Sequence, residues 1–198
     1  MKKLIVLIAV LAFVPLAFAD NFTLQSYTIA ANSTDPGLVI NTAGVASTPS
    51  NFVLNPGSSV TFDLFQIWTS ESVVNPDDTI AKNVGVSFTF NPPASSGSVT
   101  GSTFGVAQVF GLIQYGQVSW SGPSVVNFNG GQYTFTLSNE TFNVGLFGLD
   151  GGQHDGATVE ATLTYSQATP ASVPEPASML LLGTGLAGLA GMVRRRKS

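Results

Sequence analysis

The sequence contains no cysteine and only one histidine, His154. The missing cysteine excludes disulfide bonds, thiol nucleophiles and Cys-ligated metal centres. A histidine-based zinc site or a Ser-His-Asp triad would have His154 alone to use. Neither a Gly-x-Ser-x-Gly turn nor a paired-acid motif is present. We therefore expect that the protein is not an enzyme.

Positive charge is almost absent from the middle of the chain. Six of the seven Lys and Arg residues lie in the two terminal segments, which leaves Lys82, whereas ten of the eleven acids lie between Asp20 and Glu160. The central region therefore carries about 1 − 10 = −9 charges. Such a surface repels phosphate groups, which excludes nucleic-acid partners and disfavours docking on anionic lipid headgroups.

The N-terminal segment has the pattern of a secretory signal peptide. Two lysines precede an apolar run that Pro15 ends, and Ala17 and Ala19 form a small-x-small cleavage site. We predict a signal peptide over residues 1–19 and a mature chain that begins at Asp20. An uncleaved anchor is the alternative, but the apolar run is short for a membrane span.

The central region, residues 20–166, has the pattern of an all-β domain. Apolar and polar residues alternate most clearly over residues 84–90 and 157–165, and Asn-Gly-Gly at 129–131 is a hairpin signal. Nine or ten short strands separated by Gly, Pro and Asn turns predict an antiparallel β-sandwich, of jelly-roll or immunoglobulin-like arrangement. About 150 residues are enough to form one core without a disulfide or a metal.

Several local features are also predicted. The parity of the apolar residues changes near residues 25–26 and again over 65–68, which indicates β-bulges. Residues 41–50 and 97–101 are rich in small and polar residues and are predicted as loops. Residues 104–113 are predicted as one bent strand. Phe142, Val144 and Leu146 alternate with other residues and are expected to share one face.

Two acidic turns are candidate calcium sites. Asp77 and Asp78 form one, and Asp150 and Asp155, which flank a Gly-rich stretch, form the other. Carboxylate and carbonyl oxygens are the ligands that calcium prefers. Neither turn has the regular spacing of an EF-hand, so the alternative is a turn that uses Asp and Gly for backbone reasons.

Four aromatic residues are candidates for stacking on sugar rings: Trp68, Trp120, Tyr27 and Tyr115. For each of them core packing is the competing interpretation, and Trp120 alternates in step with Val118, which directs it inward. A carbohydrate-binding module, with or without calcium, is therefore the alternative function.

The last 25 residues have three parts in a fixed order. After a polar linker at 167–173, Pro174, Glu175 and Pro176 precede the uncharged residues 177–193. Seventeen helical residues span roughly 26 Å, just under a bilayer core of about 30 Å. Four cations follow directly, namely Arg194, Arg195, Arg196 and Lys197, and they would hold that end on the cytoplasmic side. Gly183, Ala187 and Gly191 are spaced as in a small-xxx-small helix-pairing face.

This segment resembles the PEP-CTERM sorting signal of Gram-negative bacteria. The resemblance rests on the Pro-Glu-Pro triplet, the Leu-Leu-Leu-Gly-Thr-Gly run at 180–185 and the basic end, and it covers residues 173–198. It implies that an exosortase, a membrane transpeptidase, recognises Pro174, Glu175 and Pro176 and removes the helix. A plain single-pass anchor is the alternative.

Together these features predict an exported surface or extracellular-matrix protein. We expect it to be held transiently in the inner membrane and then passed to the cell surface, with a structural or adhesive role in exopolysaccharide or biofilm.

Overall fold

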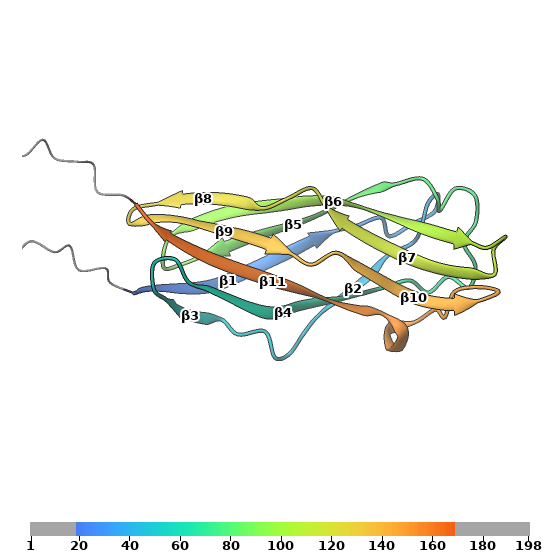
Figure 1. Cartoon of the computed structure of the whole chain (residues 1–198), viewed down its shortest axis with the longest axis horizontal. Coiled ribbons are helices and arrows are strands. Elements are labelled where there is room, and N and C mark those ends of the chain that lie inside the picture. Colours follow the sequence, from blue (N-terminus) through green and yellow to red (C-terminus); the bar gives the residue numbers. More distant parts are fainter. Residues whose placement is uncertain (1–18, 169–198) are drawn as a thin grey trace, which may run out of the picture. The chain divides into compact units, whose positions relative to one another are not determined.

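The computed structural model describes residues 19–168, which form eleven β-strands and one short 3-10 helix (Figure 1). The elements are β1 (Asp20–Ala30), β2 (Asn41–Gly44), β3 (Asn51–Leu54), β4 (Ser59–Trp68), β5 (Lys82–Phe90), β6 (Ser95–Gln108), β7 (Ile113–Trp120), β8 (Ser124–Phe128), β9 (Gly131–Leu137), β10 (Glu140–Leu146), η1 (Gln153–Asp155) and β11 (Ala157–Gln167).

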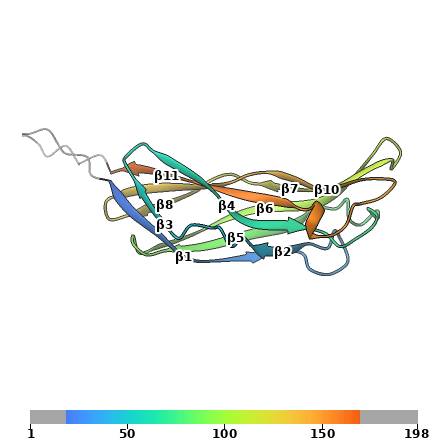
Figure 2. The same ribbon diagram turned by 90° about the horizontal axis from the view of Figure 1, so that it is seen from below.

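The strands form two sheets, and every pairing is antiparallel. One sheet has six strands in the order β10-β7-β6-β5-β1-β3, and the other has five in the order β2-β4-β11-β9-β8. The strands of both sheets run along the long direction of the domain (Figure 2). The predicted all-β, antiparallel class is confirmed.

The core consists of side chains that the two sheets direct toward each other. The rings of Phe88 on β5 and Phe135 on β9 have their centroids 4.2 Å apart, and Phe22 on β1 meets Tyr165 on β11 edge to face at 5.3 Å. Alternation along each strand places these rings on one face, because successive strand side chains point to opposite sides. The aromatic core takes the stabilising role that disulfides have in many exported domains.

Both predicted irregularities of the strands are present. The pairing of β1 with β5 shifts between Leu24 and Ser26. The pairing of β11 with β4 shifts where Leu64 has no partner, so that Leu64 and Phe65 are both buried. The change of apolar parity in the sequence therefore located each bulge correctly.

Of the two segments predicted as loops, residues 97–101 are strand throughout, whereas in residues 41–50 only the first four are strand and residues 45–50 form the predicted loop. Residues 97–101 lie within β6, and residues 41–44 form β2 at the edge of the smaller sheet. A Cβ at Gly97 would lie 2.7 Å from the Phe88 ring and 2.8 Å from the Val126 side chain. Gly97 is therefore a strand residue whose missing side chain makes room for its neighbours, which a turn-oriented interpretation of glycine overlooks.

Two further predictions about the strands are wrong. Residues 104–113 are not one bent strand, because Val109 and Phe110 adopt left-handed backbone (φ 51° and 58°) and turn the chain from β6 into β7. In β10, Phe142 is buried but Val144 and Leu146 are exposed. The left-handed Asn143 (φ 52°) interrupts the alternation after Phe142 and moves the following residues to the other face.

The two ends of the domain are formed by different elements. The start of β1 and the end of β11 lie at one end (Figure 1). Four connections lie at the other end: the β1–β2 loop (residues 31–40), the β4–β5 loop (69–81), the β6–β7 turn (109–112) and the β10–β11 loop (147–156).

Within residues 19–168 no helix is long and apolar enough to cross a membrane. The helix predicted over 177–193 lies outside the described residues.

Candidate cation site

Three carboxylates converge at the end of the domain that carries these loops. An oxygen from each of Asp35, Asp77 and Asp78 lies within 4.8 Å of the other two. Asp35 belongs to the β1–β2 loop, while Asp77 and Asp78 belong to the β4–β5 loop, about forty residues further along the chain. The sequence-predicted pair is therefore joined by a third acid that sequence reasoning did not include.

The contact between the two loops depends on Gly37. Its backbone N–H donates to Asp77 Oδ2 at 2.9 Å. Gly37 has a φ of 98°, which side chains rarely permit, and the aliphatic part of Lys82 lies directly over it, so a Cβ there would clash. The turn at Asp35-Pro36-Gly37 can thus approach Asp77 because residue 37 has no side chain.

Asp78 is the buried member of the group, with 1% of its surface exposed. Its backbone carbonyl accepts the N–H of Gly105 on β6 at 2.7 Å, and its Oδ2 accepts the N–H of Asn75 at 2.6 Å. Its Oδ1 is buried and has no hydrogen-bond donor. Because a buried carboxylate oxygen requires a donor or a cation, this atom is left without a partner by the surrounding protein.

Glu71 adds a fourth carboxylate beside Asp78. Its Oε1 accepts the N–H of Val39 at 2.8 Å, and its Oε2 is also buried without a donor. Burial raises the pKa of Glu71 to about 7, and the neighbouring Asp78 carboxylate adds to the increase although the Val39 amide opposes it. The interior of the site is thus short of positive charge.

Asp35, which is exposed, and Asp77, which is half-buried, differ in the direction of their pKa shifts. The N–H of Gly37 lowers the pKa of Asp77 below its usual value. The hydrogen bond to Asp77 and its negative charge raise the pKa of Asp35. Lys82, the one Lys or Arg of residues 19–168, forms no ion pair within 4.0 Å. The described residues therefore hold four neighbouring carboxylates without a direct basic partner.

Asp150 and Asp155, the second predicted pair, lie in a different environment. Both side chains are exposed, and neither belongs to a converging group of acids among the described residues. The buried Asn143 donates to the carbonyls of Asp150 at 2.5 Å and Gly152 at 2.8 Å. Two of the carbonyls expected to be free for a metal are thus already bonded to a side-chain amide.

His154 is a solvated residue of the same loop. It lies in η1 with its side chain 96% exposed, and its Nδ1 is 3.1 Å from Asp155 Oδ1. Asp155 is the next residue in the chain, and among residues 19–168 the His154 ring forms no hydrogen bond with a serine or threonine hydroxyl. The arrangement matches a polar loop residue.

The four candidate aromatic residues do not form an exposed platform. Trp120 packs against the core and donates from Nε1 to the Ser138 carbonyl at 2.9 Å. The Tyr27 hydroxyl donates to the Leu64 carbonyl at 2.8 Å, and the Tyr115 hydroxyl accepts from Gln108 Nε2 at 2.9 Å. Trp68 is half-buried at the end of β4. Core packing, the competing interpretation, describes Trp120 and Tyr27 well.

The exposed aromatic rings are instead Phe110 and Phe147, which sequence reasoning did not single out. Both have left-handed backbone, and the N–H of Phe147 donates to the Leu112 carbonyl at 2.8 Å, so the β6–β7 turn and the β10–β11 loop are neighbours. An alternating sequence pattern predicts that apolar residues are buried. The exposure of these two rings follows from the left-handed backbone at Phe110 and Phe147, which the pattern does not show.

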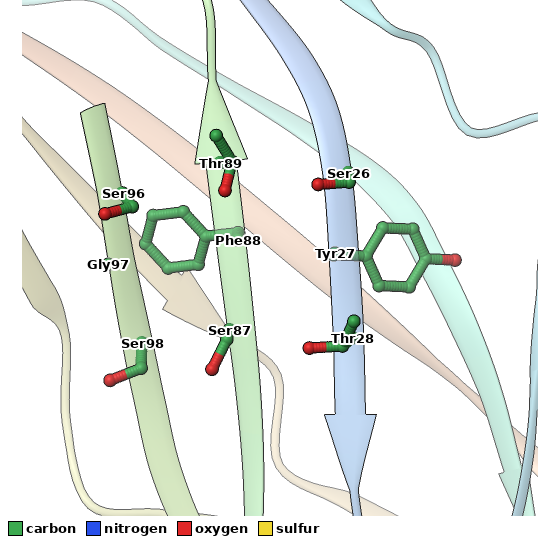
Figure 3. A pocket seen from close by; sticks show the side chains of 9 residues that line it. All are labelled: Ser26, Tyr27, Thr28, Ser87, Phe88, Thr89, Ser96, Gly97 and Ser98. Carbon is green, nitrogen blue, oxygen red and sulfur yellow. The ribbon is translucent and has the colours of Figure 1, made fainter. Parts of the chain in front are cut away.

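The outer face of the larger sheet has a shallow hollow of about 440 Å³ across β1, β5 and β6 (Figure 3). Its polar lining consists of hydroxyl groups from Ser26, Thr28, Ser87, Thr89, Ser96 and Ser98. They are paired across the strands, as in Ser26 with Thr89 and Ser87 with Ser98. Apart from Tyr27, the lining contains no acidic or basic side chain, so this hollow mainly offers hydrogen bonds.

The predicted processing residues lie mostly outside the described part of the chain. This applies to Ala17, to Pro174, Glu175 and Pro176, and to Arg194, Arg195, Arg196 and Lys197. Ala19 and Asp20 are described, and Asp20 is the first residue of β1. β11 extends to Gln167, so the predicted linker at 167–173 starts within the last strand.

Comparison with known proteins identifies one segment. Residues 172–197 match the family model of the PEP-CTERM protein-sorting motif. No curated protein and no solved structure was found to match the chain.

Proposed function

Because the chain ends in a PEP-CTERM protein-sorting motif, which implies export and processing by an exosortase, we propose that it is a structural or adhesive protein of the cell surface or extracellular matrix. The observation that carries the proposal is the order of the parts: an all-β domain ends at Gln167, and the sorting motif begins at residue 172. In this arrangement the β domain is the part that is delivered, and the C-terminal motif directs its delivery.

The charge distribution supports this order of events. All Lys and Arg residues except Lys82 lie in the segments that the signal peptidase and exosortase would remove. The basic tail would orient the helix with its C-terminal end in the cytoplasm. After both cleavages the released domain would be strongly acidic, which favours solubility and opposes adsorption to anionic lipids.

The proposed role is not enzymatic. The exposed position of His154 and the uncharged lining of the hollow across β1, β5 and β6 both support a role in binding or structure. We propose exopolysaccharide as the surrounding polymer, because the resemblance of the tail to PEP-CTERM signals implies delivery to the cell surface or extracellular polymer.

The sorting step can be tested by replacing Pro174, Glu175 and Pro176 with alanine in the native host. We expect the variant to keep its C-terminal segment and to stay in the inner-membrane fraction, because the exosortase no longer recognises its substrate. A matched control replaces Thr169 and Pro170, which precede the motif, and should be processed normally. Intact mass of the recovered protein reports both cleavages, and a triple variant that is cleaved at its C-terminal end and located like the wild type would refute the proposal.

A carbohydrate-binding role is a second candidate, and the hydroxyl-lined hollow favours it. Six Ser and Thr hydroxyls on a flat, uncharged face can donate to and accept from the hydroxyls of a neutral glycan (Figure 3). Calorimetry against a panel of polysaccharides, with calcium and with chelator, tests this role. Binding should weaken in a variant with Ser87→Ala and Ser98→Ala.

The control for that experiment lies on the other sheet. Thr134 and Thr164 form a similar cross-strand pair on β9 and β11. Their replacement by alanine should leave glycan binding unchanged. No heat with any polysaccharide, or equal losses in the two double variants, would exclude the hollow as a glycan site.

A further inference from the structure

The carboxylates at the loop end of the domain are held together by contacts between loops that are distant in sequence. The Gly37 amide binds Asp77, and the Val39 amide binds Glu71, so two residues of the β1–β2 loop each contact an acid near the β4–β5 loop. Each of these acids uses one oxygen for a backbone donor. Their carboxyl groups also contact neighbouring carboxyl groups, Asp77 that of Asp35 and Glu71 that of Asp78.

An independent observation indicates that something else belongs there. Asp78 is almost completely buried, and its Oδ1 has no donor although the same carboxylate lies within 4.8 Å of Asp35 and Asp77. Glu71 Oε2 is a second buried oxygen without a donor, on a carboxyl group that lies against that of Asp78. Buried oxygens of adjoining carboxyl groups without an N–H or O–H donor need a shared proton or a cation, and one cation can serve the whole cluster.

We propose that Asp35, Asp77 and Asp78 bind one calcium ion, which joins the β1–β2 loop to the β4–β5 loop, and that Glu71 beside Asp78 adds negative charge to the site.

The donor set favours calcium over other metals. The three aspartates supply hard oxygen ligands, and the group includes no nitrogen or sulfur donor, which disfavours zinc and copper. Calcium accepts oxygens at about 2.3–2.6 Å in flexible geometries, so two ligands on opposite sides of the ion are about 5 Å apart. The 4.8 Å limit on the three aspartates is compatible with that spacing. Magnesium requires near-ideal octahedral geometry, which two separate loops provide less readily.

The proposed place of action supports a weak site. Extracellular calcium modules typically have dissociation constants of about 0.1–1 mM. With a Kd in that range, the site would be filled outside the cell and largely empty in a cytoplasm that keeps calcium low. The inference does not depend on the sorting step, because calcium binding is measured on the purified protein.

The test uses the full chain, purified in mild detergent and freed of metals with a chelator. Calorimetry with calcium chloride at pH 8 should show one site with a Kd of about 0.1–1 mM. Calcium at about 10–30 times Kd should raise Tm by about 3–8 °C, as expected for a ligand that binds only the folded state. Magnesium at the same concentration should raise Tm by less than half as much.

Two variants separate metal binding from folding. Asp78→Asn removes the buried charge, and Asp35→Asn removes an exposed one with little risk to the fold. Each should weaken calcium binding at least tenfold and abolish most of the Tm shift. The control, Asp150→Asn with Asp155→Asn, keeps the same number of acids in the cluster and should bind calcium like the wild type.

Three outcomes would overturn the proposal. The first is a wild-type protein that neither releases heat nor gains Tm with calcium at pH 8, in which case the cluster holds protons instead of a metal. The second is an Asp35→Asn variant that binds as tightly as the wild type. The third is an equal loss of binding in the Asp150 and Asp155 control, which would place the ion at the other loop.

Discussion

The two acidic loops of this domain look equivalent in sequence and differ in the folded protein. The β4–β5 loop receives Asp35 from another loop, has Glu71 beside Asp78, and keeps two buried oxygens without donors. The β10–β11 loop keeps Asp150 and Asp155 in solvent, and the Asn143 amide binds its backbone carbonyls. An acidic turn becomes a candidate metal site when the tertiary structure adds ligands and removes water, and its own sequence decides neither.

The largest effect on stability is expected at Asn143, whose hydrogen bonds fix the β10–β11 loop. This fully buried residue accepts the Thr69 N–H at 2.9 Å and donates to the Asp150 and Gly152 carbonyls. We expect Asn143→Ala to cost about 3–4 kcal/mol of unfolding free energy, because three bonds are lost and Ala tolerates the left-handed backbone less well.

Urea denaturation measures this loss, and the exposed Asn127→Ala provides a control that should stay within about 0.5 kcal/mol of the wild type. A cost below about 1 kcal/mol for Asn143→Ala would mean that the β10–β11 loop is not held by this side chain.

A smaller effect is expected at Gly37, which holds the first loop. Gly37→Ala should destabilise the protein by about 2 kcal/mol, from the positive φ and from the displacement of Lys82. Gly57→Ala is a matched control, since Gly57 also has a positive φ (82°) but open space around it. It should cost about 1 kcal/mol, from the backbone alone.

Calcium affinity sharpens the Gly37 experiment. Gly37→Ala should weaken calcium binding, because the turn carrying Asp35 moves away from Asp77, while Gly57→Ala should not. Equal affinities in the two variants would argue against a role of this turn in the site.

The smallest effect is the pH dependence that Glu71 confers on the calcium-free protein. Its folded pKa of about 7 exceeds the unfolded value near 4.5, so the folded state binds more protons between these values. Stability should therefore decrease as pH rises from about 5 to 8. The charged groups around Glu71 are Asp35, Asp77, Asp78 and Lys82. Because solvent screens this half-buried carboxyl group, we expect the free energy of unfolding to change by only about 1 kcal/mol.

Glu71→Gln should flatten this dependence, as measured by urea denaturation at several pH values in chelator. Saturating calcium should reverse the trend in the wild type, because the ion binds the ionised carboxylates. A wild-type stability that increases from pH 5 to 8 without calcium would contradict the assigned environment of Glu71.

Much of the fold followed from local patterns in the sequence. Alternation over residues 84–90 and 157–165 identified β5 and β11, and changes of parity located the irregularities at Leu24–Ser26 and Leu64. The predictions failed where one residue acts through its neighbours in space. Gly97 is a strand residue because the Phe88 ring packs where a side chain would lie. The left-handed φ of Asn143 moves the residues after it to the opposite face of β10.

The candidate site was half predictable for the same reason. Asp77 and Asp78 stand out as an adjacent acidic pair, but nothing in the local sequence relates Asp35 or Glu71 to them. Their proximity depends on the pairing of β1 with β5 and on two backbone amides, at Gly37 and Val39. No spacing rule along the chain relates residues that are joined in this way.

The sequence by itself determined the all-β class, the acidic surface and the sorting motif at residues 172–197, because alternation, charge count and a linear recognition motif are all local properties. Only the tertiary structure decided which acids meet, which aromatic rings face water and which carbonyls are already bonded. Those properties depend on contacts between strands and loops far apart in the chain, where packing and backbone hydrogen bonds select the neighbours.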